Sequence, residues 1–211
     1  MNKEYFFISK PRCASTHIYE GLTNWNDKLN GGKPYYHSTA MKMRRLFPTK
    51  FDKSFSFSVI RNPYDLVVSW YNEHRKEKYE LQTRRFYDMS LDTWINKGCP
   101  THWKHHGFNP LCQYRWVYDQ HGRLMVSYLI RLENYKVDMT YVYQTIHKYL
   151  PKNVTLETIS KTRKNESVSN QDQPLSPQQK DKIYKLFKKD FELFGYLPSD
   201  SSVSSDSSVP Q

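Results

Sequence analysis

Large apolar side chains are gathered in a few short runs of this chain, and the first of them, residues 5–9, has charged residues on both sides. A short continuous apolar run is typical of a buried β-strand. Ser15 and Thr16 follow after a turn, where a hydroxyl group can cap a helix, and that helix places Ile18 and Leu22 on one face. The pattern therefore predicts a strand, a turn and a helix, the opening unit of an α/β domain.

The same order of elements returns from residue 55 onward. Residues 55–60 alternate in polarity and end in β-branched side chains, which predicts a strand. Asn62 is then the expected N-cap of a helix, and Pro63 is its first residue. One face of this helix is expected to pack inward, because aromatic and apolar side chains recur at helical spacing. They are Val67, Trp70, Tyr71 and His74.

Several shorter elements complete the pattern. Helices are predicted at residues 41–47, 91–95, 111–117 and 141–150, and a third strand at residues 126–130. Ser176 and Gln179 form a capping box with Pro177 at the first helical position, and the helix behind it is expected to end at Gly195. Apolar residues repeat along one side of that helix, at Ile183, Phe187, Phe191 and Phe194.

These elements predict one domain, residues 1–198, and a Ser-rich disordered tail, residues 199–211. The expected fold class is α/β, with three layers and a mostly parallel sheet flanked by helices. Between the strand–turn–helix units and the later elements, residues 98–110 are rich in His and Trp and are predicted to form a surface loop.

Composition adds a strong positive charge to this picture. The 211 residues include 32 Lys and Arg against 21 Asp and Glu, a formal net charge of +11. Such a surplus favours an anionic partner: nucleic acid, a membrane surface, an acidic polysaccharide or a polyphosphorylated cofactor. Three cysteines without regular spacing indicate a reducing compartment, and no apolar run is long enough for a signal peptide or a membrane span. We therefore expect a soluble, cytoplasmic protein, and the sequence predicts no oligomeric state.

Residues 10–16, Lys-Pro-Arg-Cys-Ala-Ser-Thr, connect the first strand to its helix. Backbone N–H groups at a helix N-terminus, with cations and hydroxyl groups nearby, form a phosphate site. A nucleotide kinase would carry G-x-x-x-x-G-K-[ST] at this place, and the chain lacks both glycines and the Lys-Ser/Thr pair. The alternative interpretation is an ordinary capped helix with basic residues beside it.

Arg61 and Ser69 mark the second turn. Arg61 follows a strand at the carboxyl edge of the expected sheet, where ligands bind in open α/β folds. Ser69 lies about two helical turns further on, so a guanidinium fork and a hydroxyl group can hold one phosphate between them. The alternative is that Arg61 pairs with a surface carboxylate and that Ser69 is only a small helical residue.

Together the two turns resemble those of sulfotransferases that use 3′-phosphoadenosine 5′-phosphosulfate (PAPS). Residues 6–16 resemble the 5′-phosphosulfate loop of that family, and residues 58–71 resemble its 3′-phosphate motif, R-[DN]-P followed by a helical Ser. Residues 37–40, 130–134 and 190–196 are similar to the carbohydrate-type branch, which includes heparan 2-O-sulfotransferases and bacterial sulfotransferase family 2 proteins. The resemblance implies a P-loop-like fold and sulfuryl transfer from PAPS to an acceptor hydroxyl, of a carbohydrate or glycolipid, leaving the product PAP.

The resemblance also implies roles for individual residues. Arg12 takes the place of the basic residue, usually Lys, that contacts the 5′-phosphosulfate and steadies the leaving phosphate, which makes it catalytic as well as cofactor-binding. The loop residues after it are implied as further cofactor ligands; they are Cys13, Ala14, Ser15 and Thr16. Ala14 stands where a Gly is common. Arg61 and Ser69 match the 3′-phosphate ligands, and Arg163 and Lys164 lie in a late basic segment that often closes over the nucleotide.

His37 matches a His that acts as the catalytic base in the 2-O-type enzymes. The chemistry agrees, because sulfuryl transfer is an in-line displacement in which positioning and cations dominate, and a neutral imidazole can accept the acceptor's proton. The leaving group is already a phosphate, so no metal is required.

Three other interpretations stay open. Cys99, Cys112 and the histidines between them invite a zinc site, but their spacing follows no standard finger, and a loop lining the acceptor site is preferred. A P-loop-like small-molecule kinase is disfavoured by the missing kinase motif. A non-enzymatic basic binder of nucleic acid or acidic glycan would show steep salt dependence without discriminating PAP from AMP. We expect no specific nucleic-acid partner.

Overall fold

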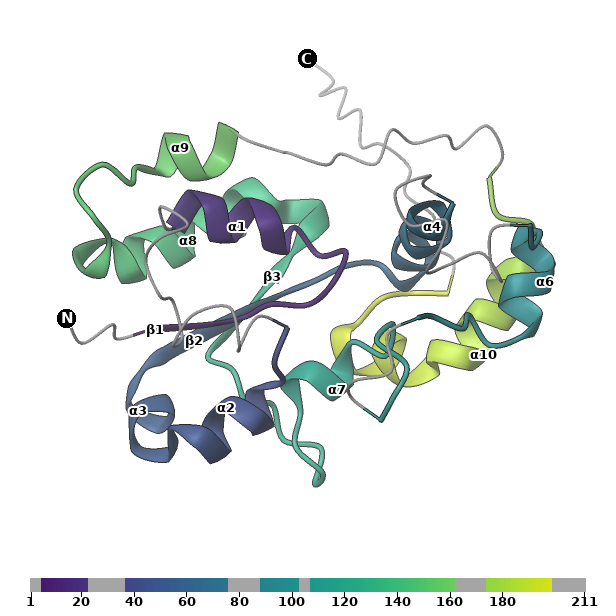
Figure 1. The fold of residues 1–211 in the computed structure, drawn as a ribbon, viewed down its shortest axis with the longest axis horizontal. Coiled ribbons are helices and arrows are strands. Elements are labelled where there is room, and N and C mark those ends of the chain that lie inside the picture. The colour runs from purple at the N-terminus through teal and green to yellow at the C-terminus, as the bar shows by residue number, and fades with distance from the viewer. Residues whose placement is uncertain (1–4, 23–36, 76–87, 103–106, 162–173, 199–211) are drawn as a thin grey trace, which may run out of the picture.

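Parallel strands form the centre of the fold (Figure 1). The computed structural model describes residues 5–22, 37–75, 88–102, 107–161 and 174–198. Within them the strands are β1 (Tyr5–Ile8), β2 (Phe55–Ile60) and β3 (Tyr128–Arg131), and all pairs are parallel. The strand order is β1-β2-β3, so β2 is central, and Phe57 is in register with Phe7 on one side and Tyr128 on the other.

Helices cover both faces of the sheet. In Figure 1, α1, α8 and α9 lie above it, α2, α3 and α7 lie below it, and α4, α6 and α10 gather beyond the carboxyl end of β2. The helix bounds are α1 Ser15–Leu22, α2 Ala40–Leu46, α3 Pro48–Lys53, α4 Pro63–His74, α6 Leu91–Asn96, α7 Tyr114–Val117, α8 Tyr135–Ile146, α9 Leu156–Lys161 and α10 Pro177–Phe194, with short 3-10 turns at Leu132–Asn134 and His147–Tyr149. This arrangement confirms the predicted α/β fold.

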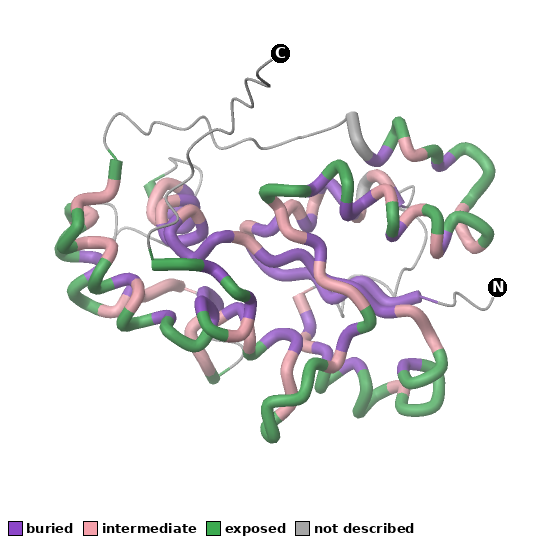
Figure 2. The backbone as a smooth tube through the Cα atoms, turned by 180° about the vertical axis from the view of Figure 1, so that it is seen from behind, coloured by how far each residue is buried: buried purple, intermediate pink, exposed green. Residues whose placement is uncertain are grey.

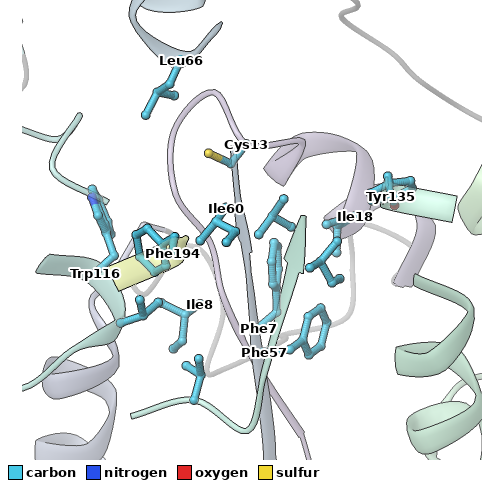
Figure 3. Packing of buried hydrophobic residues seen from close by; sticks show 14 of the residues in the cluster. Phe7, Ile8, Cys13, Ile18, Phe57, Ile60, Leu66, Trp116, Tyr135 and Phe194 are labelled. Carbon is cyan, nitrogen blue, oxygen red and sulfur yellow. The ribbon is translucent and has the colours of Figure 1, made fainter. Parts of the chain in front are cut away.

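The sheet is buried on both faces, which explains why its strands are short apolar runs. Every residue of β1 and all but the first residue of β2 are buried, and Figure 2 shows this buried stretch at the centre of the molecule, whereas β3 is mostly half-buried. The rings of Phe7 and Phe57 stack with centroids 5.1 Å apart, and Ile18 of α1 belongs to the same core (Figure 3). Cys13, from the turn after β1, is also part of this core, so the turn is anchored by packing.

The structure differs from the sequence-based prediction in three helices. Helix α8 begins at Tyr135, six residues before the predicted start, because buried residues already recur there at helical spacing. Pro48 ends α2 as expected, but it also serves as the first residue of α3, a position that suits proline. Helix α9 was not predicted.

Helix α10 has the predicted boundaries. Ser176 Oγ accepts from Gln179 N at 3.2 Å, and Gln179 Oε1 accepts from Ser176 N at 2.8 Å, which completes the capping box. Gly195 ends the helix with a φ of 65°, a left-handed conformation that glycine adopts without strain. None of the helices in the described ranges is long and apolar enough to cross a membrane.

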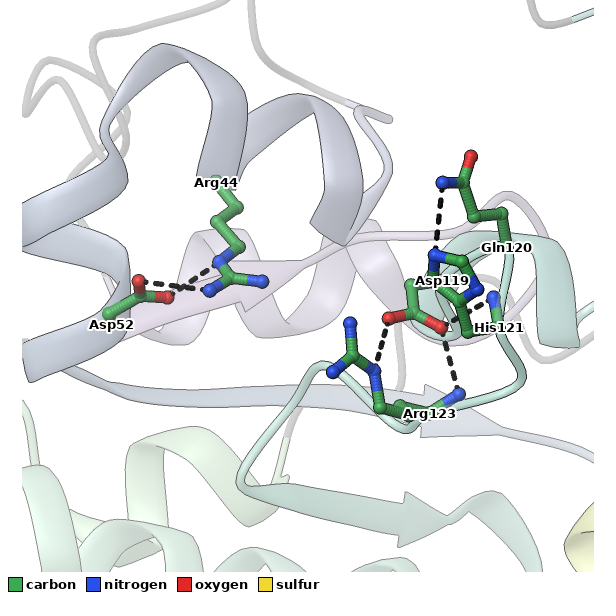
Figure 4. Close-up of polar contacts among 6 residues, drawn as sticks. All are labelled: Arg44, Asp52, Asp119, Gln120, His121 and Arg123. Carbon is green, nitrogen blue, oxygen red and sulfur yellow. Dashed lines mark hydrogen bonds and ion pairs between the residues drawn. The ribbon is translucent and has the colours of Figure 1, made fainter.

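Polar contacts fix two connections on the surface (Figure 4). Arg44 of α2 forms an ion pair with Asp52 of α3 at 2.8 Å. Asp119, at the turn between α7 and β3, accepts from His121 N at 2.8 Å and Arg123 N at 2.9 Å, and pairs with the Arg123 side chain at 2.8 Å. The hydrogen bond from the Arg123 backbone is the largest cause of the lowered pKa of Asp119. These bonds hold the turn at residues 120–122.

Candidate functional site

Two turns lie side by side at the carboxyl edge of the sheet because β1 and β2 are parallel neighbours. The first turn, residues 9–14, leads from β1 into α1, and the second, residues 61–62, leads from β2 into α4. In the first turn, Arg12 and Ala14 have positive φ values of 62° and 53°, in the left-handed region that non-glycine residues rarely adopt. Ala14 stands where a Gly is common in the family that the turn resembles, and its φ gives the physical reason for that Gly.

Hydrogen bonding holds this turn at the helix N-terminus. Ser15 is the first residue of α1, and its hydroxyl group donates a hydrogen bond to the carbonyl oxygen of Lys10. The N–H groups of the first helical turn have no acceptor within a helix, and they face the region just before it. The first turn therefore leads directly into a helix N-terminus, the kind of place where proteins bind anions.

Arg12 connects the first turn to α4. Its Nε donates to Ser69 Oγ at 3.1 Å, and its guanidinium pairs with Glu73 Oε2 at 2.7 Å. The side chains of Arg12 and Glu73 are only 15% and 12% exposed, so the pair is poorly screened by solvent. Arg12 and Ser69, which the resemblance assigns to opposite ends of the nucleotide, are thus in direct contact.

In the second turn, the side chain of Arg61 is half-buried and its main chain is fixed by hydrogen bonds. Within the described residues no group forms a hydrogen bond or ion pair with the Arg61 guanidinium, which is half-buried. The Arg61 backbone is bound on both sides by the amide of Gln113. Asn62 caps α4 as predicted, because its side chain accepts from Tyr64 N at 3.0 Å.

Glu133 and Tyr196 support the second turn from behind. Asn62 N donates to Glu133 Oε1 at 2.5 Å, and the Tyr196 hydroxyl donates to Glu133 Oε2 at 3.0 Å. Burial, followed by the negative charge of Glu133, raises the pKa of Tyr196. Residues 130–134 and 190–196, two of the segments that resemble the carbohydrate-type branch, therefore meet at this turn.

His37 lies at the first turn, although 26 residues of chain lie between it and Lys10. Its backbone N donates to Ser9 Oγ at 2.9 Å, and its ring Nδ1 lies 3.3 Å from Ser9 O. A carbonyl oxygen only accepts, so we assign the proton to Nδ1 and the lone pair to Nε2. The φ of His37 is 57°, and its ring meets the edge of Trp116 at 6.5 Å between centroids. This tautomer is the one that a general base at Nε2 needs.

Lys10 and Cys13 are buried under the first turn, each 1% exposed. Lys10 Nζ donates to Gln113 Oε1 at 3.1 Å, and Cys13 Sγ lies 3.9 Å from the same oxygen. Burial lowers the pKa of Lys10 and raises the pKa of the Cys13 thiol. Cys13 therefore anchors the loop by packing, and its thiol stays protonated.

Sequence reasoning missed Gln113, Glu73 and Asp190. Asp190 gave a readable signal, because it lies on the apolar stripe of α10 next to Phe191, where an acidic residue is rarely tolerated without partners. Glu73 follows Ser69 by four residues and so shares its helix face. A single glutamine in a short helical segment carries no pattern, so nothing in the sequence singled out Gln113.

Several predicted residues lie outside the described residues: Arg163, Lys164, His105, His106 and the tail at 199–211. Thr16 is part of α1, half-buried beside Ser15. Within the part of the chain that the structure describes, no three His, Cys, Asp or Glu side chains are grouped so as to hold a metal ion.

The pH dependence of stability offers a test of the buried Asp190. Burial raises its pKa to about 7, against the hydrogen bonds from Tyr114 N and Gln113 N and the charge of Lys10. Between its ordinary pKa and about 7, the folded state binds more protons here than the unfolded state, so stability falls as the pH rises through this range. The stability advantage of the parent over Asp190→Asn should therefore shrink by about 4 kcal/mol between about pH 4 and about pH 8.

Denaturant unfolding at a series of pH values measures this difference. Asp181→Asn, on the exposed side of the same helix, controls for the loss of a negative charge. An advantage that stays constant or grows with pH would contradict the raised pKa of Asp190.

Comparison with known proteins gives one match. A family model described as the sulfotransferase family matches residues 11–197. No curated protein and no solved structure matches the chain. The matched range begins within the first turn, at residue 11, ends just beyond α10, and includes the second turn and Gln113.

Proposed function

Because the chain belongs to the sulfotransferase family, we propose that it transfers a sulfuryl group from PAPS to the hydroxyl group of a carbohydrate or glycolipid. Family membership makes the protein a transferase enzyme and supports sulfuryl transfer in general. The donor, the acceptor and the residue roles given below are the proposal.

The Arg61 guanidinium, which has no hydrogen bond or ion pair with any of the described residues, is the observation that carries the proposal. Arginine binds phosphate oxygens through a planar fork, and a buried or half-buried guanidinium is costly without such a partner. Arg61 lies at the carboxyl edge of β2, next to the turn that carries Arg12. Two guanidinium groups, a helix N-terminus and the Ser69 hydroxyl form a set made mostly of donors, which fits a nucleotide with phosphates at both its 3′ and 5′ positions.

The chain's own residues have separate tasks. Arg61 and Ser69 would hold the 3′-phosphate, and the N–H groups from Cys13 to Thr16 would hold the 5′-phosphosulfate. PAPS supplies the sulfuryl group on a phosphate that leaves without help from a metal. Arg12 provides positive charge next to the oxygen on which negative charge grows, and Glu73 and Ser69 fix the direction of its guanidinium.

His37 would take the proton from the acceptor hydroxyl at Nε2, because the Ser9 carbonyl keeps Nδ1 protonated. The ring of Trp116 packs against the imidazole in a T-shaped arrangement. The acceptor would then be bound by residues 98–110, in which Cys99 is buried.

Transfer of radiolabelled sulfate tests this function. The parent protein is incubated with labelled PAPS and a panel of glycans, glycolipids, phenols and peptides. Label should appear on a carbohydrate or glycolipid of this panel. It should not appear on control compounds that have no free hydroxyl group. Phosphate transfer from labelled ATP under the same conditions would favour a kinase, and labelling of peptides or phenols alone would contradict the proposed acceptor class.

A further inference from the structure

A network of buried polar groups lies behind the two turns, and Gln113 is its centre. Gln113 immediately precedes α7 and is 1% exposed. Its Oε1 accepts from Arg61 N at 2.9 Å, and its Nε2 donates to Arg61 O at 2.7 Å. The amide therefore uses both its donor and its acceptor on one residue, which fixes both the place and the rotation of the Arg61 backbone.

The same amide binds the first turn. Gln113 Oε1 also accepts from Lys10 Nζ at 3.1 Å, and Lys10 belongs to the segment that leads to Arg12. The Lys10 ammonium is almost completely buried, so this bond replaces water that it has lost. One side chain thus sets the spacing between the two turns at the sheet edge.

Asp190 of α10 holds Gln113 in turn. The Asp190 carboxylate accepts from Gln113 N and from Tyr114 N, both at 2.8 Å. These are N–H groups at the start of α7, where a helix provides no acceptor. Asp190 is 1% exposed, and α10 also packs against α4, so the base of the network is rigid.

We propose that Gln113, held by Asp190, is the positioning residue that aims the Arg61 guanidinium at the 3′-phosphate of the nucleotide. The inference rests on the proposed function. The Arg61 side chain has no hydrogen bond or ion pair with any described residue, so its fixed main chain is what limits the space that the guanidinium samples. An anchored main chain lowers the entropy lost when the guanidinium binds phosphate.

The ratio of the PAP affinity to the AMP affinity measures directly how well the Arg61 guanidinium is placed to bind the 3′-phosphate. The two nucleotides differ only in the 3′-phosphate, so the ratio isolates the contacts made to that phosphate, by Arg61 and Ser69, and the Arg61→Ala background separates the part due to Arg61. Gln113→Met keeps the length of the side chain and removes its hydrogen bonds. Gln113→Asn keeps the amide, but its side chain is one methylene too short to bind Arg61 and Lys10 at the same time. This second variant keeps a polar group near the buried Lys10 and is used if Gln113→Met does not fold.

Both variants should lower the PAP/AMP affinity ratio about ten-fold, with AMP affinity near that of the parent. Isothermal titration calorimetry also gives the stoichiometry, so an unfolded fraction lowers the stoichiometry and leaves the ratio unchanged. In an Arg61→Ala background the same Gln113 substitution should not lower the ratio further. Gln179→Ala is the matched control, because it removes a glutamine that also makes two side-chain hydrogen bonds, but far along α10 from Asp190.

Three results would count against the inference. If both Gln113 variants keep the parent ratio, Gln113 has no positioning role. If PAP and AMP weaken equally, or the ratio falls as much in the Arg61→Ala background, its role is general packing. A parent protein that binds PAP and AMP equally would overturn the proposed function itself, and the inference with it.

Discussion

His37→Asn should lower the rate of sulfuryl transfer by about 10²–10⁴-fold while PAP still binds with parent affinity. Asparagine tolerates the left-handed conformation that His37 adopts, with its φ of 57°, so the backbone of the turn should be kept. Its amide can donate to the Ser9 carbonyl, as Nδ1 does at 3.3 Å. It cannot accept a proton, which isolates the role of Nε2.

His147→Asn is the matched control for this variant. The His147 ring also faces a backbone carbonyl, with Nδ1 2.8 Å from Gln144 O, but it lies at the end of α8. Its loss should leave the rate unchanged. The parent rate should also fall at acid pH, because a protonated imidazole cannot accept a proton. If His37→Asn folds, binds PAP and transfers sulfate at the parent rate, the base is another residue.

Arg12→Gln should lower kcat by about 10²–10³-fold and change PAP affinity much less. Negative charge on the leaving phosphate grows toward the transition state, so the missing cation is felt in turnover more than in binding. Glutamine can still hydrogen-bond to Ser69 and Glu73, which limits the destabilisation caused by removing the partner of a poorly exposed carboxylate.

Whether Arg12→Gln changes kcat or KM shows which role Arg12 has. Arg44→Gln removes an arginine from the exposed ion pair with Asp52 and should leave both constants unchanged. A thermal melt of each variant shows whether a lost rate is lost fold. If Arg12→Gln keeps the parent kcat and only raises KM, Arg12 binds substrate but does not stabilise the transition state.

The fold could be predicted because its signals are local. The apolar runs at β1 and β2, the Asn62 cap and the capping box at Ser176 each lie within a few residues of sequence, and all of them form as expected. Helix α8 was predicted at residues 141–150, too late at both ends, because its first turn mixes apolar and charged residues. The beginning of such a helix is visible only once its buried face, such as Met139, is known.

The candidate site could be predicted only in part, for a reason that its contacts make plain. Arg12, Arg61 and His37 stand in motifs that resemble a family, so their neighbourhood was expected, and the parallel strands bring their turns together. Gln113 contacts Arg61 across 52 residues of sequence and Lys10 across 103. Hydrogen bonds over such separations have no periodic pattern, so only the folded chain shows them.

The contact between Arg12 and Ser69 was likewise beyond the sequence. The resemblance places them at opposite phosphates, while the structure joins them by one hydrogen bond, with Glu73 beside them. If Arg12 and Ser69 bind the phosphates that the proposal gives them, the two subsites are coupled through α4. A substitution at Ser69 is expected to disturb Arg12 as well as the 3′-phosphate.

Calorimetric titration of the parent protein with PAP and with AMP is the measurement that bears most directly on the proposed donor. Arg61 and Ser69 should read the 3′-phosphate, so PAP should bind about 10–100-fold more tightly than AMP, as expected for charge-assisted hydrogen bonds to a phosphate. Arg61→Ala should remove most of that difference by weakening PAP alone. Equal affinity of the parent for PAP and AMP would contradict PAPS as the donor.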